Sequence, residues 1–154
     1  MSSLFKKLII GTAQFGLKYG IANQNGKVKE KEIKSILDFA YDNSINTLDT
    51  AKVYGSSEES IGSYLNLAES QWSVITKVVK SEIDLIKQIE DSKKKLTVWP
   101  TVILAHSASV FLDPIFQSKI SAIKSKKKIK SVGVSVYNEK EINQVLKARN
   151  KPDV

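Results

Sequence analysis

The sequence alternates short apolar runs with longer amphipathic stretches, and this alternation limits the fold more than any other feature. Runs of three to six residues occur at 8–11, 47–49, 73–77, 101–106 and 131–135. Such runs are typical of strands buried on both faces of a parallel sheet. Their starts lie 26 to 39 residues apart, which leaves room for a helix between successive strands. The sequence therefore predicts five βα units with right-handed crossovers.

Five amphipathic stretches between or after these runs predict the helices. Apolar residues recur at helical spacing in four of them: Ile33, Ile36, Leu37, Ala40 and Tyr41; Ile83, Ile86 and Ile89; Ile115, Phe116, Ile120 and Ile123; Ile142, Val145 and Leu146. The remaining stretch spans about 57–65. Helix starts are indicated by capping patterns, namely Ser56 with Glu59, Ser81 with Asp84, Asp113-Pro114, and Asn138 with Glu141.

Five βα units fit two architectures. One is a complete doubly wound sheet, and the other is part of an eight-stranded barrel, which typically needs about 250 residues. The 154 residues, 42% of them apolar, suit one domain over 1–154 with a real core and no internal boundary. The pattern alone does not choose between the two architectures.

Composition excludes several kinds of site and partner. With no Cys and a single His, the chain has no disulfide, thiolate metal site, cysteine nucleophile or multi-histidine zinc site, and no metal is predicted. No apolar run approaches the roughly 18 residues that cross a bilayer, and no secretory signal is present, so we expect a cytoplasmic protein without a membrane partner. The net charge of +8 includes lysine runs at 93–95 and 126–128. The first run closes an expected helix and the second follows one, and cations near helix carboxyl ends complement the helix dipole, so no nucleic-acid partner is predicted.

Polar side chains stand at the carboxyl ends of three consecutive expected strands. Asp49 ends the second strand, Lys77 the third and His106 the fourth, and Tyr54 lies just before the next helix. Ligands of parallel α/β folds bind at this end of the sheet. We therefore expect these four side chains to form the active site.

The four side chains have a coherent chemical use. A tyrosine hydroxyl is ordinarily a weak acid, but a nearby ammonium favours the phenolate. Tyr54 is therefore the predicted general acid, Lys77 its activator and Asp49 the anchor of Lys77. His106 orients a carbonyl oxygen or shares the donated proton. Such a site suits protonation of a carbonyl oxygen while a nicotinamide supplies hydride to the carbon.

Five segments extend this pattern along nearly the whole chain. They are Gly11-Thr12-Ala13-Gln14-Phe15-Gly16; Asp49-Thr50-Ala51 with Tyr54-Gly55 and Ser57-Glu58; Ile75-Thr76-Lys77; Leu104-Ala105-His106; and Gly133-Val134-Ser135. In order and spacing they resemble the aldo-keto reductase family. The resemblance implies a TIM (β/α)8 barrel, NADPH as the usual cofactor with NADH not excluded, and reduction of an aldehyde or ketone. It also implies a catalytic tetrad of Asp49, Tyr54, Lys77 and His106, and cofactor contacts from Gly11, Thr12, Asp49 and Ser135.

Two departures from the family pattern shape the expectation. Ser135 is followed by Val136 where many members have Asn, and the chain stops at 151–154, where a sixth strand would begin. We therefore expect the amino-terminal part of a barrel, truncated before strand six. Its open edges favour self-association or pairing with a missing carboxyl-terminal half. The alternative function is a non-catalytic remnant or binding module of the same fold.

Overall fold

The computed structural model describes residues 7–67, 71–80, 84–126 and 128–154. Five strands form one sheet in the order β1-β2-β3-β4-β5, and each neighbouring pair is parallel. The strands are β1 (Ile10–Gly11), β2 (Thr47–Asp49), β3 (Ser73–Val78), β4 (Val102–Ala105) and β5 (Ser131–Val134). All five predicted strands are present, and only their ends differ from the prediction.

The strand order decides between the two architectures. A doubly wound sheet reverses its strand order at a switch point, whereas the strands of a barrel follow chain order. Here each strand pairs with the next one in sequence. The fold is therefore five consecutive βα units of a (β/α)8 barrel, as the resemblance implied.

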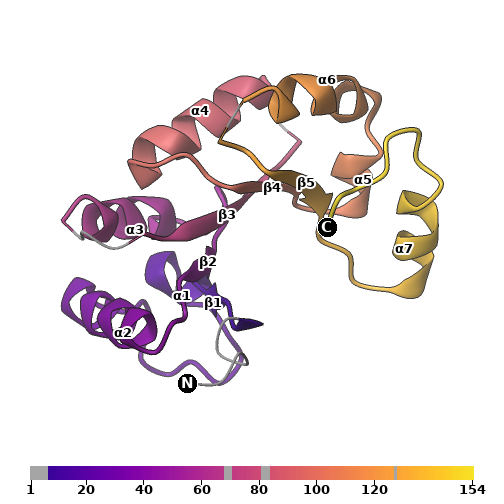
Figure 1. Ribbon diagram of the computed structural model, residues 1–154. Helices are drawn as coiled ribbons and strands as arrows, with labels where there is room; N and C mark the ends of the chain where they lie inside the picture. The colour runs from indigo at the N-terminus through magenta and orange to yellow at the C-terminus, as the bar shows by residue number, and fades with distance from the viewer. Residues whose placement is uncertain (1–6, 68–70, 81–83, 127) are drawn as a thin grey trace.

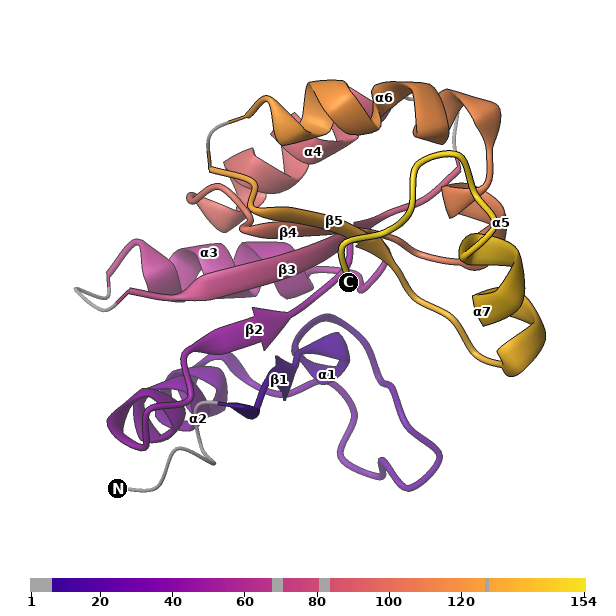
Figure 2. The same cartoon turned by 45° about the vertical axis from the view of Figure 1, so that its right-hand side comes forward.

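Helices cover one side of this sheet. Both views show α2 (Glu30–Asp42), α3 (Ser57–Leu65), α4 (Leu85–Leu96) and α6 (Pro114–Lys124) along that side (Figures 1 and 2). Short helices α1 (Ala13–Gly16) and α5 (Ala108–Phe111) follow β1 and β4 at their carboxyl ends, and α7 (Glu139–Val145) packs beside α5. Among the described residues, no helix is long and apolar enough to cross a bilayer.

Two apolar clusters fill the space between sheet and helices. One joins β2 and β3 to α2 and α3, and consists of Phe15, Ile33, Leu37, Leu48, Ile61, Leu65, Val74 and Leu96. The other surrounds β4 and β5 and includes Val78, Ile89, Ile103, Phe111, Phe116, Ile120, Ile123, Val132 and Val145. The apolar faces predicted for the helices thus supply much of the core. The prediction was wrong for Tyr41, Ile115, Ile142 and Leu146, which are exposed.

The helix starts confirm two of the four predicted capping patterns, those at Asp113 and Asn138. The carboxylate of Asp113 and the amide oxygen of Asn138 accept hydrogen bonds from the backbone N–H groups of Ile115 and Glu141. Asp84 caps α4 directly, so that helix begins at Leu85 and not near Ser81. The predicted contributions of Ser81 and Ile83, and Lys127 of the second lysine run, lie outside the described residues.

The capping box predicted at α3 does not form. The Ser56 side chain makes no cap hydrogen bond and accepts one from Lys27 Nζ, while Glu59 pairs with Lys95 at 2.9 Å. Both partners come from segments distant in sequence. Long-range contacts therefore replaced the local pattern here.

The two outer strands differ in what lies beside them. β1 is shorter than predicted: it begins at Ile10, and Leu8 and Ile9 lie outside it and are exposed. At the other edge, Asp153 N donates to Val132 O at 2.8 Å, and Val134 N donates to Val154 O at 3.2 Å. Residues 153–154 thus run along β5, in the place that the next strand of a barrel takes.

Candidate active site

The sheet brings the four predicted side chains to one rim. Asp49 is the last residue of β2, Lys77 is next to last in β3, and His106 follows β4. Tyr54 lies between β2 and α3. Because all strands are parallel, their carboxyl ends point the same way (Figure 2). The predicted clustering is therefore present in the structure.

Three acceptors hold the Lys77 ammonium in place. Its Nζ lies 2.7 Å from each carboxylate oxygen of Asp49 and 2.9 Å from the backbone oxygen of Thr50. The Lys77 side chain is only 7% exposed, whereas that of Asp49 is 30% exposed. Charge-assisted hydrogen bonds of this kind are among the strong ones. The positive charge is thus fixed at one point inside the rim.

Tyr54 lies against the Lys77 ammonium. Lys77 Nζ donates to Tyr54 Oη at 3.4 Å, and lies 5.0 Å from the centre of the phenol ring. Because the phenol oxygen accepts this hydrogen bond, its own proton can be donated to another molecule. The next residue, Gly55, has a φ of +58°, and the oxygen of Gly16 would lie 2.4 Å from a Cβ at this position. Glycine is therefore required immediately after the tyrosine.

His106 faces the same ring. The ring centres of His106 and Tyr54 lie 6.3 Å apart at an angle of 76°. Burial, and then repulsion from Lys77, lower the pKa of His106 below its ordinary value, although Asp49 acts in the opposite direction. His106 Nδ1 is buried and has no hydrogen-bond partner among the described residues. The imidazole is therefore neutral near pH 7, and it can donate a hydrogen bond through one nitrogen only.

The predicted cofactor residues fall into two groups. Gly11 and Thr12 line a cleft of about 430 Å³ together with Asp49 and Tyr54. A Cβ at Gly11 would meet nothing within 4 Å, so the cleft is open there. Thr12 is fully buried, and both its N–H and its hydroxyl donate to the Asp49 backbone oxygen. Ser135 follows β5, where its N–H donates to Ala105 O, and it does not line this cleft.

Sequence reasoning missed several residues near the rim. Gln14 and Tyr19 also line the cleft, joined by a hydrogen bond from Gln14 Nε2 to Tyr19 O. Ser57 and Glu58, quoted above only as part of a motif, are buried polar residues directly after the tyrosine turn. Their adjacency to Tyr54 in the sequence is the signal that indicates a role near the site.

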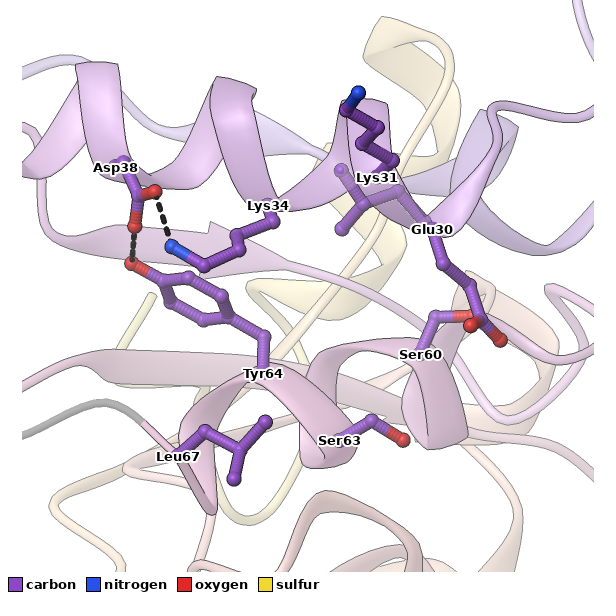
Figure 3. A pocket seen from close by; sticks show the side chains of 9 residues that line it. Glu30, Lys31, Lys34, Asp38, Ser60, Ser63, Tyr64 and Leu67 are labelled. Carbon is purple, nitrogen blue, oxygen red and sulfur yellow. Dashed lines mark hydrogen bonds and ion pairs between the residues drawn. The ribbon is translucent and has the colours of Figure 1, made fainter.

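A second hollow, of about 330 Å³, lies between α2 and α3 (Figure 3). Three of its polar side chains bind one another, since Asp38 accepts from Lys34 Nζ at 2.6 Å and from Tyr64 Oη at 3.0 Å. None of the four rim side chains lines it. This hollow belongs to the helical layer and lies away from the rim that the strand ends form.

Comparison with known proteins agrees with the fold and the motifs. Residues 7–154 match the profile of the Aldo/keto reductase family. No curated protein sequence matches the chain. Among solved structures, a putative aldo-keto reductase from Pseudomonas aeruginosa is 25% identical with a TM-score of 0.76, and the match covers 96% of this chain and 63% of that one.

Two structures from Klebsiella pneumoniae show the same fold. One is an aldo/keto reductase in complex with NADP and acetate, 20% identical, with a TM-score of 0.68. The other is an aldo-keto reductase in complex with NADPH, 18% identical, with a TM-score of 0.71. Each match covers 91% of this chain and 49% of the Klebsiella chain. The chain thus spans between about half and 63% of the length of these structures. Its match to the family profile over nearly all its residues shows that it belongs to the aldo/keto reductase family.

Proposed function

We propose that the chain carries the catalytic residues of an NADP(H)-dependent oxidoreductase that reduces an aldehyde or ketone to an alcohol. The observation that carries this proposal is the hydrogen bond from Lys77 Nζ to Tyr54 Oη, with Lys77 itself locked by Asp49. An ammonium so placed stabilises the phenolate that remains after proton donation. Family membership and the NADP(H)-bound Klebsiella structures support the same reaction class.

Each side chain has one role in the proposed step. Tyr54 Oη donates its proton to the carbonyl oxygen, and the remaining phenolate is stabilised by Lys77. Neutral His106 directs a hydrogen bond at the same carbonyl oxygen and fixes its position. Asp49 prevents the Lys77 ammonium from moving away. When bound, the nicotinamide supplies the hydride that reduces the carbonyl carbon.

The residues of the cleft fit such a cofactor. Gly11 leaves open space beside Asp49 and Tyr54, so a flat ring can approach the acid closely. Thr12 uses both donors on the Asp49 backbone oxygen, so its part is to hold Asp49 and to form the cleft wall. We assign to Ser135, on the other side of the rim, a contact with the nicotinamide half of the cofactor. We take residues 1–154 as a single amino-terminal part of the barrel, without an internal domain boundary.

The proposal applies to the barrel in its closed form. This chain supplies five of the eight βα units, so the remaining strands come from further chain or from association with another chain. Self-association, a carboxyl-terminal partner and a cytoplasmic location remain predictions. Gel filtration at micromolar concentration tests the first of these, and a monomer that unfolds cooperatively would contradict it.

NADPH binding and turnover test the proposal. We expect a saturable change in NADPH fluorescence and NADPH-dependent reduction of an aldehyde panel. Tyr54→Phe is expected to abolish reduction while leaving NADPH binding intact, because only the donated proton is lost. Tyr137→Phe is the matched control, since Tyr137 is 80% exposed. No binding at millimolar NADPH would refute the proposal and favour the non-catalytic alternative, and a parallel titration with NADH determines the cofactor preference.

A further inference from the structure

Five buried polar side chains lie behind the catalytic rim and take no part in the proposed chemistry. They are Thr12, Thr50, Ser57, Glu58 and Thr76, and each is at most 1% exposed. They connect the ends of three strands to the first turn of α3. Burying polar groups costs free energy unless they are hydrogen-bonded, so the connections among them are informative.

Ser57 fastens α3 to β1 and β2 through a chain of hydroxyl groups. Thr50 Oγ1 donates to Ser57 Oγ at 3.0 Å, and Ser57 Oγ donates to the backbone oxygen or the hydroxyl of Thr12, each at 2.9 Å. Thr12 Oγ1 then donates to the Asp49 backbone oxygen at 2.9 Å. Each hydroxyl in this chain is a donor, and such connected networks hold one geometry.

Glu58 fastens the same turn of α3 to β3. Thr76 Oγ1 donates to Glu58 Oε1 at 2.7 Å. Glu58 Oε2 is buried and has no hydrogen-bond partner in the described part of the chain, which costs free energy. Side chains alternate along a strand, so Thr76 points towards α3 while the next residue, Lys77, points to the opposite face. The hydrogen bond to Glu58 therefore lies on the face of β3 opposite to the one from which Lys77 projects.

Both partners of the 3.4 Å contact are attached to this network. Tyr54 precedes Ser57 by three residues, and Ser57 N donates to Tyr54 O at 3.0 Å across the tight Gly55 turn. Lys77 follows Thr76 directly. We propose that Ser57 and Glu58 are positioning residues that set the separation of Tyr54 Oη and Lys77 Nζ by fixing the start of α3 against the strand ends. This inference rests on the proposed function, because the separation matters for catalysis only when Tyr54 is the general acid.

Thr76→Val tests the Glu58 connection, because it removes one hydroxyl and keeps the shape. In the full chain labelled with ¹³C-tyrosine, we expect the substitution to change the chemical shift of the Tyr54 ring carbons. The Tyr54 signal is assigned by its absence in Tyr54→Phe. We also expect kcat for NADPH-dependent carbonyl reduction to fall roughly 10- to 100-fold, with KM changed less than about twofold. Thr76→Ser keeps the hydroxyl and is expected to give the Tyr54 resonance and the kcat of the unchanged chain.

Thr101→Val is the matched control. Its hydroxyl also joins two strands, since Thr101 Oγ1 bonds Ser73 Oγ at 2.6 Å and Val74 O at 3.2 Å, but it lies at the opposite end of the sheet. It is expected to leave the Tyr54 resonance and kcat unchanged. An equal response to Thr76→Val and Thr101→Val would overturn the positioning role.

Ser57→Ala removes the second connection and takes the place of Thr76→Val if that variant does not fold. An unmoved Tyr54 resonance in a folded Ser57→Ala chain would equally overturn the inference. If the unchanged chain binds NADPH but reduces no carbonyl, the proposed function fails. The NMR comparison still decides the positioning role in that case, because it needs no turnover.

Discussion

Replacing Lys77 by Met tests the central electrostatic contact of the site. The substitution removes the ammonium that lies 3.4 Å from Tyr54 Oη and keeps a side chain of similar length. At that separation a unit charge stabilises a phenolate by about 1.2 kcal/mol in a water-like dielectric and by about 5 kcal/mol at an effective dielectric constant of about 20. These energies correspond to losses in rate of about 8-fold and about 4,000-fold. Because Tyr54 is half-buried, we expect a loss within this range.

The assay compares Lys77→Met with Lys95→Met. Lys95 also forms an ion pair, at 2.9 Å with Glu59, but it lies on α4 in the helical layer. Asp49 keeps contact with solvent after Lys77→Met, being 30% exposed, so we expect the variant to fold. Circular dichroism and NADPH titration verify folding and binding, and steady-state reduction of an aldehyde gives kcat. A kcat for Lys77→Met within threefold of the Lys95→Met value would refute the reasoning.

Two further predictions concern stability. Gly62→Ala places a Cβ 1.9 Å from the Lys95 backbone oxygen, so we expect the free energy of unfolding measured in urea to fall by about 1–3 kcal/mol or more. Gly11→Ala has open space around it and is expected to change this free energy little, so equal losses in the two variants would contradict the packing argument. The lowered pKa of His106 means that the unfolded chain binds this proton more readily than the folded chain, so stability is expected to fall as the pH drops below about 6.5. Urea unfolding at several pH values, compared with His106→Gln, measures this dependence, and an unchanged slope in the variant would contradict it.

Local sequence patterns predicted the βα units and identified the residues of the rim. Apolar runs of strand length at regular spacing predict βα units, and the last residues of parallel strands meet at one rim. The clustering of Asp49, Lys77 and His106 therefore follows from their positions at the ends of the apolar runs. The caps at Asp113 and Asn138 were also predictable, because a cap involves residues that are close in sequence.

Features that depend on distant segments could not be predicted in this way. Whether the sheet is doubly wound or part of a barrel depends on which strands pair. The apolar pattern left this open, the family resemblance implied the barrel, and the observed strand order confirmed it. The Ser56 cap failed because Lys27, from a distant loop, binds its hydroxyl. Similarly, no local pattern indicates that Thr76 reaches Glu58, since the two meet only when α3 packs on β3.

The sequence by itself thus determined the elements and which polar side chains stand at the strand ends, because periodicity and capping act over a few residues. The tertiary structure alone decided the separation of Lys77 and Tyr54, the lowered pKa of His106 and the buried network behind them. Those properties follow from packing and burial between segments far apart along the chain. Local sequence patterns do not encode such contacts.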